Sequence, residues 1–168
     1  GHQRGDDALL VMPMCHANSL NFFCAFSYAG GVSSIYSRPS FDADHAMSVM
    51  EGNGSTFTSL VPTHYIMMLA QADGRVRDLG RMRKLMISSA PARADTKRAI
   101  MEMFPNSGLF ELYGSSEAGW VTMLHPDEQF SHLGTVGREC VGSAPVRLLD
   151  DAGHEVPDGQ PGELFSCT

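Results

Sequence analysis

The sequence predicts an α/β fold: a mostly parallel sheet flanked by helices, followed by a small β-rich segment with the character of a partial barrel. Two observations lead to this prediction. Apolar runs typical of buried strands alternate with stretches of helical period as far as about residue 120, and such alternation is characteristic of parallel sheets. Beyond that point, strand-like runs are separated by turn sequences and no helical pattern remains.

The first elements follow from apolar patterning and capping residues. LLVMPM at 9–14 is a continuous apolar run, which suits a strand covered on both faces. The run 18–31 is apolar nearly all round and predicts a buried helix, and 32–37 predicts a short strand. Asp42 can cap the next helix. That helix has apolar residues at helical spacing, namely Ala43, Ala46, Met47 and Met50.

Three more strands and two more helices are expected before the pattern changes. The strands are 56–61, 84–90 and 108–113. Pro62 suits the first position of the helix that follows the first of these strands. The apolar faces of the two helices are formed by Tyr65, Met68, Leu69 and Ala72 and by Ala99, Ile100, Met103 and Phe104.

The last part of the chain reads as β-structure. Strand-like runs at 121–125, 145–150 and 162–167 are separated by glycine-, proline- and aspartate-rich turns. We therefore expect 1–128 to form an α/β subdomain and 129–168 to form the incomplete start of a β-barrel-like subdomain.

Composition narrows the class of protein. With 43% apolar and 18% charged residues in 168, the chain is globular rather than disordered. The net charge of −7 argues against a nucleic-acid partner, which needs clustered Lys and Arg. The four cysteines contain no CxxC pair, so reduced thiols in a cytoplasmic protein are the simplest interpretation. No apolar run approaches the ~20 residues of a membrane span, so no transmembrane segment is expected.

Polar and aromatic residues follow two of the predicted strands. Ligands of an open parallel sheet bind beyond the carboxyl ends of its strands. SSAP at 88–91 offers small residues, and Tyr113 offers a ring that can stack on a base. Ser115 and Ser116 can hydrogen-bond phosphate oxygens, and Glu117 is a ligand type that Mg²⁺ accepts. The spacing alone favours an ordinary strand-to-loop turn over a ligand site, and neither GxxxxGK[ST] nor a strand-linked GxGxxG occurs.

The order of several segments resembles the middle of the large domain of the acyl-adenylating superfamily. This family contains acyl-CoA synthetases, luciferases and peptide-synthetase adenylation domains, and the style here is closest to fatty-acyl or aryl-acyl CoA ligases. The resemblance covers about residues 8–166. It rests on PMCHANSL (13–20), LVPTHY (60–65), SSAPA (88–92), YGSSEAG (113–119), GTVGREC (134–140) and DDAGHEVPDGQPGELF (150–165).

The resemblance implies a nucleotide site, whose motifs fall within 1–128. Tyr113 would stack on adenine, Ser116 would contact the α-phosphate region, and Glu117 would hold Mg²⁺ through the phosphates of ATP. Glu111 stands where glutamine or asparagine is commoner in the family. The residues placed at the nucleotide are Ser89, Ala90, Pro91, Glu111, Leu112, Tyr113, Gly114, Ser115 and Ser116.

The resemblance also implies a pocket for a small-molecule carboxylic acid. His16 would lie at its entrance, close to the reacting carboxylate, and would act with Ser116 and Glu117 as a catalytic residue. A helix-capping role for His16 and a simple core role for Trp120 remain as alternatives. The walls of the pocket would be His16, Asn18, Leu20, Phe22, Phe23, Gly119 and Trp120.

The implied reaction uses ATP, Mg²⁺ and coenzyme A to form first an acyl-adenylate and then an acyl-CoA. In the family a glycine-rich phosphate loop would precede residue 1, and a ribose-binding aspartate and a lysine-bearing domain would follow residue 168. We therefore expect this chain to be a fragment that is inactive alone and that self-associates through surface its missing parts would cover.

Two other interpretations stay open. A peptide-synthetase-type adenylation domain is one, although the aspartate that such domains usually carry for the substrate amine is absent between Pro13 and Tyr28. A non-catalytic binding or assembly module that keeps the fold is the other.

Overall fold

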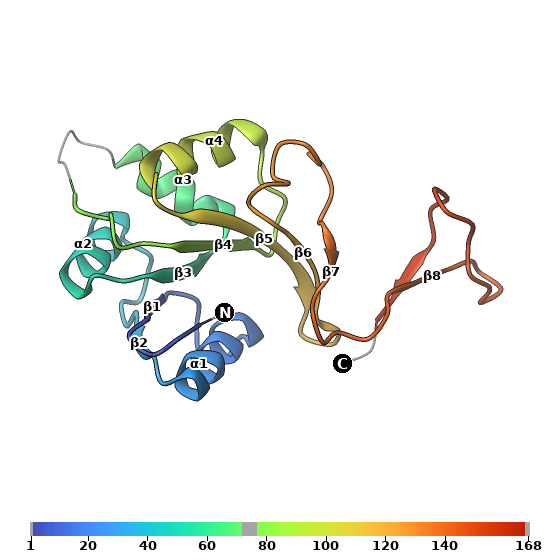
Figure 1. Cartoon of the computed structure of the whole chain (residues 1–168), viewed down its shortest axis with the longest axis horizontal. Helices are drawn as coiled ribbons and strands as arrows, with labels where there is room; N and C mark the ends of the chain where they lie inside the picture. Colours follow the sequence, from blue (N-terminus) through green and yellow to red (C-terminus); the bar gives the residue numbers. More distant parts are fainter. Residues whose placement is uncertain (1, 72–76, 167–168) are drawn as a thin grey trace.

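The computed structural model describes residues 2–71 and 77–166, in which a large sheet lies between two layers of helices (Figure 1). The strands of that sheet are β1 (Asp7–Leu10), β2 (Val32–Ile35), β3 (Phe57–Leu60), β4 (Lys84–Ser88), β5 (Gly108–Ser115), β6 (Gly119–Leu124) and β7 (Arg138–Glu139). The helices are α1 (Ala17–Ala29), α2 (Ala43–Asn53), α3 (Pro62–Ala70) and α4 (Ala94–Met103). A separate antiparallel pair consists of β8 (Arg147–Leu149) and β9 (Glu163–Phe165).

The large sheet has the strand order β2-β1-β3-β4-β5-β6-β7. The pairs from β2 to β5 are parallel, whereas β6 and β7 add antiparallel strands at one edge. The predicted fold class, a mostly parallel sheet flanked by helices and followed by a small β-rich segment, is confirmed.

Alternating side chains of the strands supply two hydrophobic cores, one on each face of the sheet. Leu9 and Leu109 face the core shared with α2, α3 and α4. Leu10 and Leu112 face the opposite core, where α1 contributes buried aromatic side chains. Figure 1 shows the same layering, with α1 on one side of the sheet and α3 and α4 on the other.

Local signals placed the start of two helices correctly. The Asp42 carboxylate caps α2 by accepting a hydrogen bond from the His45 backbone N–H at 3.0 Å. Pro62 is the first residue of α3, where its missing N–H leaves no intrahelical bond unmade. The predicted stripe of α2 is fully buried and consists of Ala43, Ala46, Met47 and Met50.

The prediction of a buried helix near 18–31 is correct for one face only. Along α1 the buried residues are Ser19, Phe22 and Phe26, whereas the Tyr28 side chain is 97% exposed. The reason is that α1 packs on the sheet with one face only. The first strand also ends earlier than predicted, at Leu10, before the run reaches Pro13.

The chain beyond 128 still contributes to the large sheet, since β7 pairs with β6. The division into 1–128 and 129–168 therefore remains a prediction. Two predicted residues, Ala72 in a helix and Cys167 at the end of a strand, lie outside the described residues. Within the described part of the chain, no helix combines the length and apolar character that a membrane span requires.

Candidate active site

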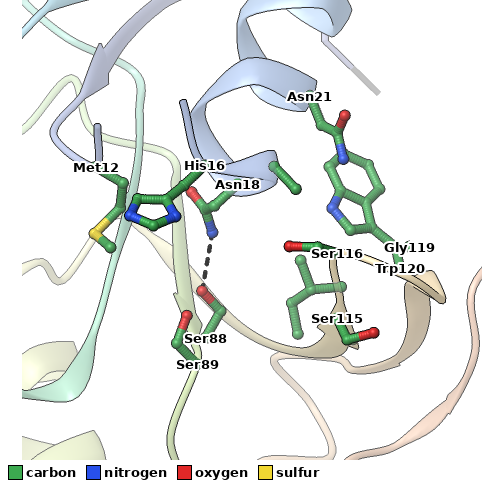
Figure 2. Close-up of a pocket in the computed structure, with 13 residues that line it drawn as sticks. Met12, His16, Asn18, Asn21, Ser88, Ser89, Ser115, Ser116, Gly119 and Trp120 are labelled. Carbon is green, nitrogen blue, oxygen red and sulfur yellow. Dashed lines mark hydrogen bonds between the residues drawn. The ribbon is translucent and has the colours of Figure 1, made fainter. Parts of the chain in front are cut away.

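A cavity of about 280 Å³ opens at the carboxyl ends of β1 and β4, beside the turn between β5 and β6 (Figure 2). The start of α1 forms one wall and the ends of β4 and β5 form the other. The lining residues are Met12, His16, Ala17, Asn18, Asn21, Ser88, Ser89, Leu112, Gly114, Ser115, Ser116, Gly119 and Trp120.

The sheet brings the two predicted polar segments together. Ser88 at the end of β4 is the register partner of Leu112 in β5, so the residues that follow each strand emerge at the same edge. Ser89 from one segment and Ser115 and Ser116 from the other line the same cavity (Figure 2). The edge therefore presents hydroxyl groups from two neighbouring strands to one space.

The start of α1 contributes the opposite polar wall. Asn18 donates a hydrogen bond from Nδ2 to Ser88 Oγ at 3.0 Å, which links α1 to β4 across the cavity (Figure 2). Asn18 Oδ1 is buried and has no hydrogen-bond partner within the described part of the chain, so it can accept one from a ligand. His16 occupies the N-cap position of α1, but its side chain makes no capping bond. Its imidazole lines the cavity instead.

The turn between β5 and β6 is a tight antiparallel connection. The Ser115 hydroxyl accepts hydrogen bonds from the backbone N–H groups of Glu117 and Ala118, at 3.2 and 3.0 Å. At Gly114 the two strands lie so close that a Cβ would lie 2.1 Å from the Gly119 carbonyl oxygen. The segment is therefore both a hairpin turn and a wall of the cavity, and its role toward phosphate and Mg²⁺ stays a prediction.

Backbone strain also lies at the cavity. Ser89 has a φ of +69°, and it is the single non-glycine residue with positive φ among the described residues. Such conformations cost free energy and persist where surrounding structure holds them, often at ligand sites.

Glu117 and Tyr113 lie at the tip and edge of the turn. Neither residue is among those that line the cavity. Glu117 is exposed, and hydrogen bonding from its own backbone N–H and then from the Ser115 hydroxyl lowers the pKa of its carboxyl group. The Tyr113 side chain is 41% exposed. Both groups are thus open to solvent, with the Glu117 carboxylate ionised at neutral pH.

The other predicted site residues outside the cavity differ in their surroundings. Phe22 is buried, and the centroid of its ring lies 4.8 Å from that of Trp120, which lines the cavity. Leu20 and Phe23 are partly exposed on α1. Glu111 lies on the opposite face of the sheet, where it pairs with Lys97 of α4. Ala90 and Pro91 follow Ser89 in the loop and do not line the cavity.

The family follows from comparison with known proteins, because residues 1–166 match the model of the AMP-binding enzymes. The chain belongs to the AMP-binding enzyme family. The fold agrees: O-succinylbenzoate coenzyme A synthetase from Bacillus subtilis, solved in complex with AMP, aligns with a TM-score of 0.83 over 98% of this chain and 32% of that one. The identity in that alignment is 19%, so it shows the fold alone.

Curated relatives of this AMP-binding chain are CoA ligases. 4-Coumarate–CoA ligase 1 of Oryza sativa subsp. japonica is 28% identical over 168 residues, which cover 98% of this chain and 30% of that protein. Indoleacetate–CoA ligase of Aromatoleum aromaticum is 28% identical over 162 residues, which cover 95% of this chain and 31% of that protein. The chain thus spans less than a third of the length of these relatives.

The AMP-binding chain lines its cavity with three residues that the sequence did not single out, namely Met12, Ala17 and Asn21. A signal existed for Asn21, since it lies three residues after Asn18 and therefore on the same helix face. Met12 follows β1 closely, so the rule that ligands bind at strand ends could have included it once the end of that strand was known.

The donor set suits a nucleotide with Mg²⁺ better than a metal held by protein ligands alone. Among the described residues there is no group of three or more His, Cys, Asp or Glu side chains that could hold a metal ion. Mg²⁺ commonly keeps waters and takes one or two carboxylates together with substrate phosphates. The single ionised Glu117 beside the hydroxyls of Ser115 and Ser116 fits that pattern.

Proposed function

We propose that this chain is part of an ATP- and Mg²⁺-dependent carboxylate–CoA ligase, which forms an acyl-adenylate and then an acyl-CoA. The observation that carries the proposal is the single cavity shared by Ser88, Ser89, Ser115, Ser116 and His16 at the carboxyl edge of the sheet. Membership of the AMP-binding family and the CoA ligases among the relatives support it. Because the chain spans less than a third of those relatives, the proposal concerns the whole protein that contains it.

The first step would join the acid to AMP. A carboxylate oxygen attacks the α-phosphorus of ATP, and the bond from that phosphorus to the bridging oxygen breaks as pyrophosphate leaves. Ser116 would donate to the phosphate near the reacting phosphorus, and His16 and Asn18 would orient the carboxylate. Glu117 would hold Mg²⁺, which neutralises phosphate charge when bound. These groups act by positioning and by stabilising developing charge.

The second step would transfer the acyl group to coenzyme A. The thiolate sulfur attacks the carbonyl carbon of the acyl-adenylate, a thioester forms, and the bond to the AMP oxygen breaks so that AMP leaves. No covalent bond to the protein is needed in either step. Tyr113 and the loop at 89–91 would hold the adenine ring throughout.

We further propose that the acid carries a fatty or aryl group, with the aryl class favoured by the relatives named for 4-coumarate and indoleacetate. A second cavity of about 430 Å³ lies beside the first and shares Asn21 and Trp120 with it. Its lining includes Cys24, Ala25 and Val141, which suits an apolar group.

The isolated chain also has an expected activity, location and state of association. The 168-residue chain alone is expected to be inactive. A cytoplasmic location is supported by the free thiols of Cys15, Cys24 and Cys140. Self-association is supported by exposed apolar side chains on α1, among them Leu20 and Tyr28.

The test is pyrophosphate release by the full-length protein with ATP, Mg²⁺, CoA and a panel of aryl and fatty acids. We expect Glu117→Ala to lower the rate about a hundredfold or more, as loss of one preorganised polar group typically does. Glu102→Ala is the matched control, since Glu102 is an exposed carboxylate on α4, away from the cavity. Unchanged release by Glu117→Ala would remove Glu117 from the site, and no release with any acid would contradict the proposed activity.

A further inference from the structure

A buried ion pair lies on the face of the sheet opposite the cavity. Lys97 of α4 and Glu111 of β5 keep only 2% and 7% of their side chains exposed, and Nζ lies 2.5 Å from Oε2. Removing one partner of such a pair is strongly destabilising, whereas replacing both by apolar residues is often neutral. Net stability therefore does not explain why two charges are buried here. The other contacts of these two side chains offer an explanation.

The second oxygen of Glu111 reaches the loop that leads into α4. Glu111 Oε1 accepts a hydrogen bond from the Ala92 backbone N–H at 3.4 Å. The N-cap residue of α4, Arg93, makes no side-chain capping bond. Glu111 thus anchors a loop whose own helix start supplies no side-chain cap, and Lys97 neutralises the buried carboxylate.

The other end of this loop is the strained wall of the cavity. Ser88 and Ser89 both line the cavity, and Ser89 has the positive φ of +69°. In the sheet register Glu111 lies opposite Ile87, directly before these two residues. A strained residue keeps its conformation when both sides of it are fixed. Here Ser88 is fixed on one side by Asn18 and Ala92 on the other by Glu111.

We propose that Glu111 is a positioning residue that fixes the loop 89–92 against the nucleotide end of the cavity, and that Lys97 is the counter-charge that allows its carboxylate to be buried there. The inference rests on the proposed function, because the loop is the part of the site assigned to adenine. Neither side chain lines the cavity, so Glu111 acts through the Ala92 N–H. This assigns to Glu111 a different task from the direct nucleotide contact that the sequence resemblance implied.

Two double variants of the full-length protein separate positioning from burial of charge. Lys97→Met with Glu111→Gln removes both charges but keeps a carbonyl oxygen that can accept from Ala92. Lys97→Met with Glu111→Leu removes both charges and the acceptor. For the Leu variant we expect the KM for ATP to rise roughly 3- to 10-fold, the range that corresponds to one hydrogen bond. The KM for the acid should stay within about twofold of the unsubstituted value, because the loop 89–92 is assigned to adenine and not to the acid.

The Gln variant is the rescue control, and its KM for ATP should stay close to that of the unsubstituted protein. Equal KM values for ATP in the two double variants would overturn the proposal, as would an equal rise for ATP and acid in the Leu variant. Thermal melting of both variants shows whether each is folded before kinetics are measured.

Amide hydrogen exchange tests the same contact without any need for activity. In the unsubstituted protein the Ala92 amide should exchange more slowly than an unprotected amide, and the Gln variant should keep this protection. Exchange of Ala92 at the unprotected rate in the unsubstituted protein would overturn the positioning role even if the Leu variant failed to fold. If the protein released no pyrophosphate but Ala92 was protected, the assigned function would fail while the loop contact stood.

Discussion

Gly114 lies where the two strands of the β5–β6 hairpin come closest. A Cβ there would meet the Gly119 carbonyl oxygen at 2.1 Å, and backbone cannot yield as a flexible side chain can. We expect Gly114→Ala to lower the free energy of unfolding by about 1–3 kcal/mol, the usual cost of overpacking. Because Gly114 also lines the cavity, binding of ATP should weaken as well.

Gly52 in α2 offers the matched control for this substitution. A Cβ at that position would meet no atom within 4 Å. Glycine within a helix is less stable than alanine by roughly 0.5–1 kcal/mol, so Gly52→Ala should raise the melting temperature. Chemical denaturation of both variants measures the two changes, and a Gly114→Ala protein as stable as the unsubstituted one would contradict the close approach.

The sequence could not decide which of Glu111 and Leu112 faces the cavity. Both were predicted at the nucleotide, yet successive strand residues point to opposite faces. Leu112 lines the cavity and Glu111 lies in the α4 layer. Choosing between them requires knowing which face holds the cavity. The face that holds the cavity is set by where α1 packs on the sheet. This packing brings together residues far apart in the sequence, so it cannot be read from local patterns.

Asp42 caps α2, and its carboxyl group should make the stability of the fold depend on pH. The hydrogen bond from the His45 N–H is the main cause that lowers the pKa of Asp42 from its ordinary value of 3.8, with Arg38 adding to it. A carboxyl whose folded pKa is lowered stabilises the fold above its unfolded pKa, and this contribution is lost as pH falls through the folded value. The loss should therefore begin near pH 4 and continue below it.

Two variants separate the charge of Asp42 from its cap. Asparagine caps helices about as well as aspartate but does not titrate. Asp42→Asn should therefore have nearly the melting temperature of the unsubstituted protein at pH 7, and its melting temperature should fall less steeply as the pH drops below about 4. Asp42→Ala should melt lower at every pH. Circular dichroism melts across this range measure all three proteins, and parallel pH profiles for aspartate and asparagine would refute the linkage.

Helix starts were predictable because their causes are local. Asp42 and Pro62 act on backbone groups within a few residues, so the sequence alone placed them. The exposure of α1 was not predictable in the same way. Its apolar side chains predict burial, but Tyr28 and Leu20 remain exposed among the described residues. Burial depends on what lies opposite a face, and neither periodicity nor composition contains that information.

The fold class followed from a property of the whole molecule, the alternation of strands and helices that only a covered parallel sheet satisfies. Handedness and short connections then determine that Ser88 and Ser115 emerge at one edge. The identity of the ligand does not follow from this arrangement, because strand ends serve many chemistries. Glu117 and Tyr113 are open to solvent, so their surroundings do not identify a ligand. The proposed contacts with Mg²⁺ and adenine are therefore decided by the activity of variants.

The edge of the sheet at β2 carries the last prediction. β2 is the terminal strand on that side, and its Val32 and Ile35 side chains are 58% and 50% exposed. An exposed apolar edge strand offers unpaired backbone groups to a second chain. We therefore expect the 168-residue chain to self-associate with rising concentration. Ile35→Lys should weaken this association about tenfold or more, because a charge at an edge opposes strand pairing. Val141→Lys is the control, since Val141 is fully exposed but lies outside the strands. Sedimentation velocity over a concentration series measures all three proteins. Equal association of the Ile35→Lys and Val141→Lys variants would exclude the β2 edge as the contact.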